Sequence, residues 1–281
     1  HFMRSVALIA TRALELIGED VDGRKLRERL RLLLIRAVAN TELRFLARAR
    51  TDLDLVLTLA VARRQVESEA EARRWLGIVA RLSGNLPAAR GELSEAVRLL
   101  RGLDSPLRLA RALRDRAFVE LVGGDPGAAE QLLDEAELLA KQADDPIGLA
   151  WVEWHRAWLG FITGEIAQAE ARLVRAAETM TFLGDRGGMG WVNGLLAYVR
   201  LYQGRAEEAA ALADSVLTEA RDRGDEWAAG MMQALQANLR LWQGRTDEAW
   251  KLADTARQRF RRTSDGFGEL QALAPLARAS A

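Results

Sequence analysis

The sequence predicts an all-α fold, a right-handed α-solenoid of stacked helical hairpins, and three observations carry this prediction. A turn signal repeats every 40 residues between apolar segments. The apolar residues follow helical rather than alternating periodicity, and β-branched residues are sparse, so strands are not expected. Hairpins of the predicted length are too short to bury their apolar faces alone, so neighbouring units must stack.

The turn signal is a glycine that stands at the same place in five consecutive units. These glycines are Gly84, Gly124, Gly164, Gly204 and Gly244. Glycine adopts a positive φ at no cost, because it has no Cβ, and this suits the tight turn that follows a helix. Each glycine is therefore expected to separate the first helix of a unit from the second.

Four further columns keep the same frame without gaps. Small residues precede the glycines by seven positions, at Gly77, Ala117, Ala157, Ala197 and Ala237. Small residues follow by five positions, at Ala89, Ala129, Ala169, Ala209 and Ala249, and by twelve, at Ala96, Ala136, Ala176, Val216 and Ala256. The last column is predicted to cap the next helix, with Ser105, Asp145, Asp185, Asp225 and Asp265. Small side chains at these places let two helices cross closely.

The columns fix the element boundaries of one unit. Its first helix is predicted over about 146–163 and its second over about 166–183, and proline begins the first, where its missing N–H is harmless. Clear units run from about Glu69 to Arg262. The segment 266–281 is expected to be the first helix of another unit whose partner is missing, which suggests a fragment of a larger protein.

The N-terminal part fits the frame poorly, although its periodicity still predicts helices. These are expected over 4–17, 24–48 and 52–64, with a break at residues 18–23. We therefore divide the chain into degenerate helical or capping units over 1–67 and repeats over 68–281, all in one continuous solenoid. No linker rich in serine, glycine or proline separates the two parts.

Composition excludes several classes of function. The 40 basic and 40 acidic residues balance, which argues against direct contact with nucleic acid, and no apolar segment approaches the ~20 residues that span a bilayer. Cysteine is absent and only His1 and His155 are present, so we expect no catalytic, metal or cofactor site. The phosphate-binding loop and the usual hydrolase and zinc motifs are also absent. The sequence is that of a cytoplasmic protein that is not an enzyme.

The repeat resembles the tetratricopeptide (TPR) motif in the spacing of its small residues. Segments 203–209 and 243–249, Gln-Gly-Arg-Ala-Glu-Glu-Ala and Gln-Gly-Arg-Thr-Asp-Glu-Ala, look like its inter-helix turn. The unit is 40 rather than 34 residues long, and some apolar positions of the motif are polar here. Longer units of this kind, with the joint Leu-Gly-Asp-Arg-Gly-Gly at 183–188, resemble the MalT-like regions of LuxR-type ATP-dependent bacterial regulators. This resemblance implies a sensing role, with the ATPase and the DNA-binding module elsewhere in the polypeptide.

Two sets of side chains compete as the partner-binding surface. A polar strip on the first helices faces the groove if those helices line the concave side, and it comprises Arg116, Glu120, Glu153, Arg156, Asn193, Arg200, Gln233, Gln236 and Arg240. The alternative is a merely solvated face. The TPR map places a second, aromatic set on the concave face, comprising Trp151, Trp154, Trp158, Trp191 and Tyr198. Helical periodicity instead packs these rings between units.

These features lead to two hypotheses about function. The first is a non-enzymatic sensor domain of a bacterial transcriptional or signalling regulator, which binds a peptide, protein or small-molecule effector in its groove. The second is an assembly scaffold that forms homo-oligomers through apolar residues of the unfinished C-terminal helix. No motif supports an enzymatic function. His155 has no second histidine or cysteine nearby, so it is expected to be a structural residue.

Overall fold

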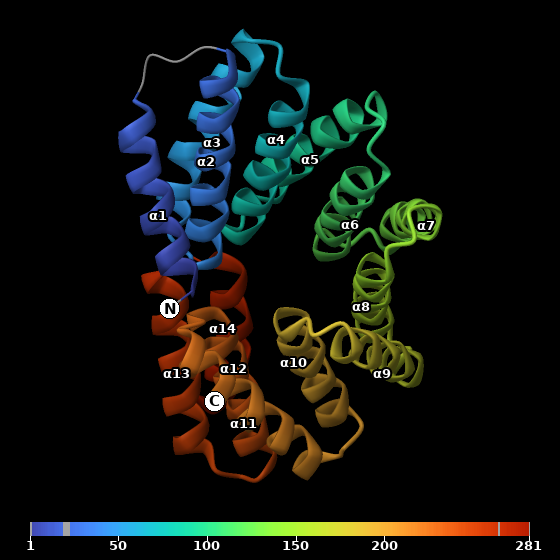
Figure 1. Ribbon diagram of the computed structural model, residues 1–281. Helices are drawn as coiled ribbons and strands as arrows, with labels where there is room; N and C mark the ends of the chain where they lie inside the picture. Colours follow the sequence, from blue (N-terminus) through green and yellow to red (C-terminus); the bar gives the residue numbers. More distant parts are fainter. Residues whose placement is uncertain (1, 19–22, 264, 281) are drawn as a thin grey trace.

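The computed structural model describes residues 2–18, 23–263 and 265–280, apart from the side chains of Arg223 and Phe267. Within these ranges the chain forms fourteen α-helices and no strand (Figure 1). The helices are α1 (Phe2–Ile17), α2 (Gly23–Glu42), α3 (Leu46–Ala62), α4 (Val66–Leu82), α5 (Leu86–Arg101), α6 (Pro106–Val122), α7 (Pro126–Gln142), α8 (Pro146–Thr163), α9 (Ile166–Phe182), α10 (Arg186–Tyr202), α11 (Ala206–Arg223), α12 (Glu226–Trp242), α13 (Thr246–Arg262) and α14 (Gly266–Ser280).

The five predicted hairpins are confirmed. Each turn glycine separates a first helix from its second helix, from α4 and α5 to α12 and α13, and each has a φ between 72° and 88°. The alanines five positions after the glycines are fully buried, where the two helices cross. At Gly77 a Cβ would lie 2.5 Å from Leu93 Cγ, so the close crossing of α4 and α5 excludes a larger residue there.

The predicted caps are confirmed at four of five positions. The carboxylates of Asp145, Asp185, Asp225 and Asp265 accept hydrogen bonds of 2.8–3.0 Å from the backbone N–H three residues later. This satisfies one of the N–H groups that a helix start leaves without a partner. Ser105 makes no such bond, so α6 begins on Pro106 without a side-chain cap.

The N-terminal segment requires a correction, because its second and third helices follow the 40-residue frame. Helix α2 ends at Glu42 rather than near 48, and α3 begins at Leu46 rather than 52, because the chain turns at Arg44. Arg44 occupies the glycine column with a φ of 61°. The small columns hold Ala37, Ala49 and Val56, all fully buried. The prediction missed this hairpin because an arginine replaces the expected glycine. The domain division near residue 67 stays a prediction.

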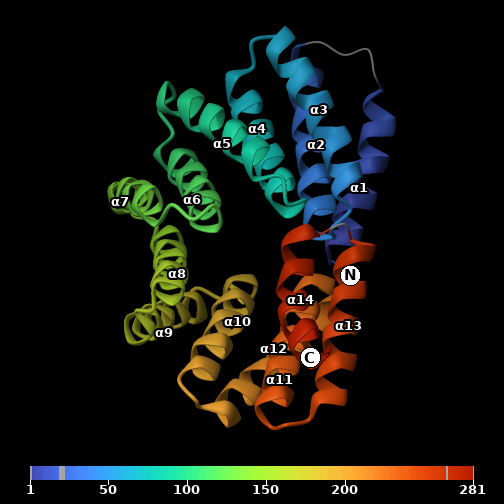
Figure 2. The ribbon, with the colours of Figure 1, turned by 180° about the vertical axis from the view of Figure 1, so that it is seen from behind.

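The solenoid closes on itself. First helices α4, α6, α8, α10, α12 and α14 contact one another in succession, and α14 then contacts α4, while second helices α5 to α13 lie outside them (Figures 1 and 2). At this seam a Cβ on Gly266 would lie 3.4 Å from the Ser83 carbonyl oxygen. Arg44 Nε lies 3.7 Å from Asp265 Oδ2, and both side chains are almost completely buried. The expected open groove is therefore the inside of a ring.

No described helix is long and apolar enough to cross a membrane. The core follows the ring, since its largest buried clusters join successive first helices with the second helices behind them. Each first helix thus has two functional faces, one towards the second helices and one towards the inside of the ring.

Candidate functional site

The polar strip does not face the inside of the ring. On α6, Glu120 is 3% exposed and accepts hydrogen bonds of 2.6 Å from Arg116 Nε and from an Arg90 nitrogen on α5. Arg116 also donates to Ser94 Oγ on α5, at 2.5 Å. Burial acts to raise the pKa of Glu120, but the hydrogen bonds from Arg90 and Arg116 hold it below its ordinary value. This part of the strip joins α6 to a second helix.

The strip residues of α8 have the same role. Arg156 donates to Glu137 Oε2 at 2.5 Å and to Asp134 Oδ1 at 2.6 Å, and lies 3.4 Å from Glu130 Oε1, all on α7. Burial opposes the charge of Arg156, yet these carboxylates raise its pKa. Glu153 on the same helix pairs with two arginines of α9 at 2.9 and 3.2 Å. Helix α8 is therefore held to both flanking second helices.

The later units complete this pattern. Arg200 pairs with Glu170 of α9 and Glu208 of α11, and Arg240 pairs with Glu248 of α13. Gln233 accepts from Arg259 of α13 at 2.9 Å, and Gln236 donates to Asp214 of α11 at 2.7 Å. Among the strip members, Asn193 alone has neither a hydrogen bond nor an ion pair to a described residue through its side chain. The second helices supply the partners of the paired residues, and the role of the strip as a partner-binding surface stays a prediction.

The aromatic set both packs between units and lines the ring. Trp154 is 4% exposed, and its indole N–H donates to the Trp191 carbonyl at 3.1 Å. Tyr198 donates to the Met231 carbonyl at 3.2 Å, which ties α10 to α12. Trp151, Trp158, Trp191 and Tyr198 are half-buried. Trp154 therefore packs between units, while the other rings keep part of their surface exposed.

Two indole groups in this zone have no acceptor. The buried Nε1 atoms of Trp158 and Trp227 make no hydrogen bond within the described structure. Both rings line a small cavity of about 30 Å³ between α8, α10 and α12, which has room for a water molecule. The Trp191 and Trp227 rings lie 4.3 Å apart at 31° and separate this cavity from a larger one.

The larger cleft is about 510 Å³ and opens beside the stacked rings. It lies between the start of α1, the end of α2 and the starts of α10 and α12. Glu42, Asp222 and Asp225 line it together with Trp191 and Trp227. The pKa of Glu42 is raised, chiefly because the surrounding protein removes water from its carboxylate. The volume is typical of a site for a small molecule or a peptide side chain.

The sequence reasoning missed a cluster of charges inside the ring. We define the inner cluster as Arg81 of α4, Arg114, Asp115 and Phe118 of α6, and His155 of α8. The Arg81 guanidinium carbon lies 4.7 Å from the centre of the Phe118 ring, which lies 5.8 Å from His155. Asp115 is engaged by Arg74 at 2.5 Å. Three successive first helices thus meet at this cluster.

Neither Arg81 nor Arg114 forms a hydrogen bond or an ion pair with a described residue. The Arg114 Nε atom is buried without an acceptor. Burial lowers the pKa of Arg81 and that of Arg114 to about 10, since both guanidiniums lose water without gaining a paired carboxylate. His155 donates or accepts through Nδ1 at the Trp151 carbonyl, 2.6 Å away. Burial and the two nearby guanidiniums lower the pKa of His155 to about 3, which keeps the ring neutral.

The repeat frame contained a signal for this cluster. Arg114 stands 40 residues before Trp154 and Arg74 stands 80 before it, so all three occupy one column of the first helices. The TPR spacing that places Trp154 on the concave face therefore places Arg114 and Arg74 on the same face in the two earlier units. No cluster of three or more potential metal-ligating residues occurs in the described part of the chain.

No protein-family model matches this sequence, and no curated protein matches it. Solved structures do match in fold. A Rap protein complexed with competence and sporulation factor superposes with a TM-score of 0.63 at 13% identity, over 93% of this chain and 76% of that one. A STAND protein with a tetratricopeptide repeat sensor from Pyrococcus horikoshii gives 0.57 at 13% identity, over 92% of this chain but 44% of that protein. Aspartyl phosphate phosphatase F from Bacillus subtilis gives 0.58 at 12% identity, over 89% and 69%. The chain thus has the fold of TPR-like helical-repeat proteins.

Proposed function

We propose that this chain is a non-enzymatic interaction domain that binds an acidic segment of a peptide or protein partner inside the ring. The observation that carries the proposal is the pair of inner guanidiniums, Arg81 and Arg114, which have no carboxylate partner in the described structure. Guanidinium groups recognise carboxylates with two parallel hydrogen bonds, and such pairs are stronger away from water. The aromatic side chains of α8, α10 and α12 supply apolar contact beside them.

The regulatory context is part of the same proposal. A Rap protein and a STAND protein with a repeat sensor share the fold, and one of these structures contains competence and sporulation factor. We place this chain as the sensing region of a bacterial transcriptional or signalling regulator of the LuxR-type, MalT-like kind, in the cytoplasm. Because α14 meets α4 at the seam, a ligand inside the ring contacts helices from both halves of the chain.

A fluorescence titration tests this function. Hexaglutamate added at low salt is expected to change the tryptophan emission in a saturable way, while hexalysine is not. Replacing both inner arginines, Arg81→Gln with Arg114→Gln, is expected to weaken hexaglutamate binding at least about tenfold, since each removes a desolvated charge contact. Arg63→Gln is the control, because Arg63 is exposed, forms no ion pair with a residue that the structure describes, and lies at the turn after α3. Equal binding of both peptides, or no loss in the double variant, would overturn the proposal.

A second candidate function is self-assembly, and a specific observation favours it. Helix α1 exposes Phe2, Ile9 and Leu16 at 75%, 67% and 88%, and α14 exposes Leu270 at 62%. Apolar side chains at both ends of a solenoid suit association with another copy. Light scattering across protein concentration separates the two candidates, since a strict monomer at every concentration contradicts the scaffold and leaves the inner site unaffected.

A further inference from the structure

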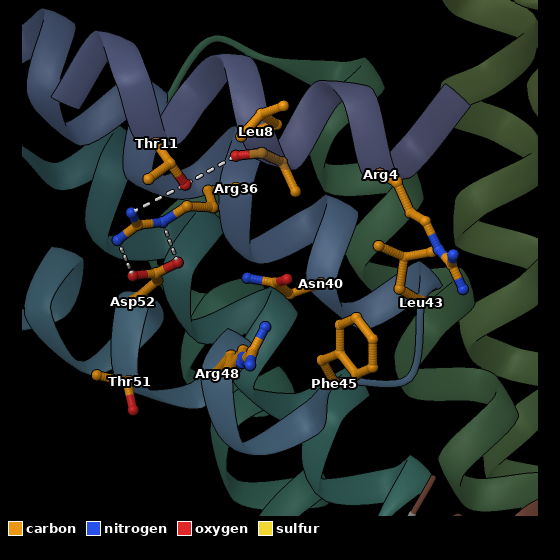
Figure 3. Close-up of a pocket in the computed structure, with 11 residues that line it drawn as sticks. Arg4, Leu8, Thr11, Arg36, Asn40, Leu43, Phe45, Arg48, Thr51 and Asp52 are labelled. Carbon is orange, nitrogen blue, oxygen red and sulfur yellow. Dashed lines mark hydrogen bonds and ion pairs between the residues drawn. The ribbon is translucent and has the colours of Figure 1, made fainter. Parts of the chain in front are cut away.

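A second concave site lies between α1, α2 and α3, separate from the inner cluster. Its volume is about 470 Å³, within the range of small-molecule sites. Figure 3 shows its side chains converging from the three helices and from the turn at Leu43–Phe45. Nothing in the proposed inner site uses these residues, apart from the turn that contains Arg44.

The lining of this pocket carries a positive charge that is not balanced. It includes three arginines, Arg4, Arg36 and Arg48, and one carboxylate, Asp52. Arg36 donates a hydrogen bond to each carboxylate oxygen of Asp52. Its Nε lies 2.9 Å from Oδ2, and a second guanidinium nitrogen lies 2.7 Å from Oδ1 (Figure 3). The hydrogen bonds that Arg36 donates to Asp52 raise the pKa of Arg36, so this pair stays ionised. Arg4 and Arg48 have no ion pair with any residue in the described ranges.

An amide completes the polar wall. Asn40 is 6% exposed, yet its side chain makes no hydrogen bond to a described residue. It lies at the centre of the pocket lining, between the Arg36–Asp52 pair and Phe45 (Figure 3). Its N–H groups are therefore available to an acceptor that enters the pocket.

The remaining lining is apolar. Leu8 of α1, with Leu43 and Phe45 of the turn, forms the wall opposite Thr51 and Asp52. The Arg48 guanidinium carbon lies 5.3 Å from the centre of the Phe45 ring, which holds the charge at the edge of this wall. Nearby hydroxyls are already engaged, since Thr11 and Thr51 donate to backbone carbonyls of their own helices.

We propose that this pocket binds a small organic anion, an oxyanion group carried on an apolar body. Arg4 and Arg48 balance its charge, and the Asn40 amide donates to one of its oxygens. The apolar body lies on Leu8, Leu43 and Phe45. A carboxylate and a phosphate ester share this chemistry. Leu43 and Phe45 flank Arg44, so an occupied pocket supports the turn that meets Asp265 at the seam.

Nuclear magnetic resonance of the side-chain amides tests the proposal with three probes. Hexanoate and phenyl phosphate are expected to shift the Asn40 NH₂ signals, assigned with Asn40→Ser, while hexanol leaves them in place. The anion that binds more tightly shows whether the pocket prefers a carboxylate or a phosphate ester. Shifts with hexanol equal to those with hexanoate, or no shift with either anion, would overturn the proposal.

A double variant tests the role of the charges of Arg4 and Arg48. Arg4→Gln with Arg48→Gln is expected to weaken hexanoate binding about tenfold or more, since both lining charges are removed. Both residues are exposed, so the fold does not depend on them. Arg12→Gln is the control, because Arg12 lies on α1 but pairs with Glu15 outside the pocket. Unchanged affinity in the double variant contradicts the assignment. This readout is independent of the inner site, whose test uses tryptophan emission.

Discussion

The first helices present arginines on two faces, and the two faces differ in how those charges are satisfied. On the face towards the second helices, Arg156 contacts three carboxylates between 2.5 and 3.4 Å. On the face inside the ring, Arg114 and Arg81 contact none in the described structure, although both are largely surrounded by protein. All three residues are arginines on first helices of the repeat units. The two faces therefore differ because carboxylates contact Arg156, whereas none among the described residues contacts Arg81 or Arg114.

The two faces of the first helices therefore differ in role, one structural and one available for binding. Paired arginines connect first helices to second helices and stabilise the unit. Arginines that lose water without a partner oppose folding, and such local costs are typical of binding sites. An anionic ligand is therefore expected to gain the most binding free energy inside the ring, where Arg81 and Arg114 have no carboxylate partner among the residues that the structure describes.

The largest effect is expected at the seam, where the buried Arg44 pairs with Asp265. Arg44→Met removes the cation that lies 3.7 Å from the buried carboxylate of Asp265, and this should lower the free energy of unfolding by about 3 kcal/mol. Urea denaturation measures the loss. Arg50→Met is the control, because the exposed pair of Arg50 with Asp54 should contribute less than about 1 kcal/mol. Equal losses in the two variants would show that the seam does not stabilise the ring.

A smaller loss is expected on the face towards the second helices. Arg156→Met removes the cation that neutralises Glu137 and Asp134, and we expect a decrease of about 2 kcal/mol, because Asp134 is screened by solvent. Chemical denaturation again provides the value. The exposed Arg98, paired within its own helix with Glu95, is the matched control. An effect no larger than that of Arg98→Met would remove the structural role assigned to the strip.

The pH dependence of stability probes the inner charges directly. Unfolded histidine protonates near pH 6.5, whereas His155 in the fold does so only near pH 3, because of burial and the guanidiniums of Arg114 and Arg81. As the pH falls below 6.5, the unfolded chain takes up the proton first, so stability is lost by up to about 1.4 kcal/mol per pH unit. Above pH 6.5 this contribution is complete and constant. His155→Gln should flatten the slope between pH 6.5 and 4.5, and an unchanged slope would contradict the assignment.

The smallest effect has the opposite sign. Arg114→Leu replaces a guanidinium that has lost water without gaining a partner, so the free energy of unfolding should rise by about 1 kcal/mol. A thermal or urea transition measures the change. If this variant is destabilised as strongly as Arg156→Met, the two faces do not differ in the way described.

Much of the fold was predictable because its signals are local. The turn glycines, the aspartate caps and the buried alanine columns each report the backbone within a few residues, and all three recur in the structure. The α2–α3 turn was missed because Arg44 takes a positive φ where the frame expects glycine. The closure of the ring was not predictable, since it depends on α14 meeting α4 at a long distance in sequence.

The site was predicted less well, for a physical reason. Periodicity assigns Arg156 and Gln236 to a face but does not show which carboxylates stand opposite, so a paired strip looked like a free one. For the aromatic set, the sequence left the concave face and inter-unit packing as alternatives; Trp154 packs between units, and a binding role for the other rings stays a prediction. Of the two inner arginines, Arg114 shares the column of Trp154 but stands in an earlier unit, and Arg81 lies in a different column.

The most direct test of the central claim is the position of an anion in a crystal soaked with bromide, located by anomalous diffraction. We predict a bromide at the guanidinium of Arg81 or of Arg114, and none at the paired guanidiniums of Arg116, Arg156 and Arg200. Bromide at the paired arginines, with no density inside the ring, would contradict the account.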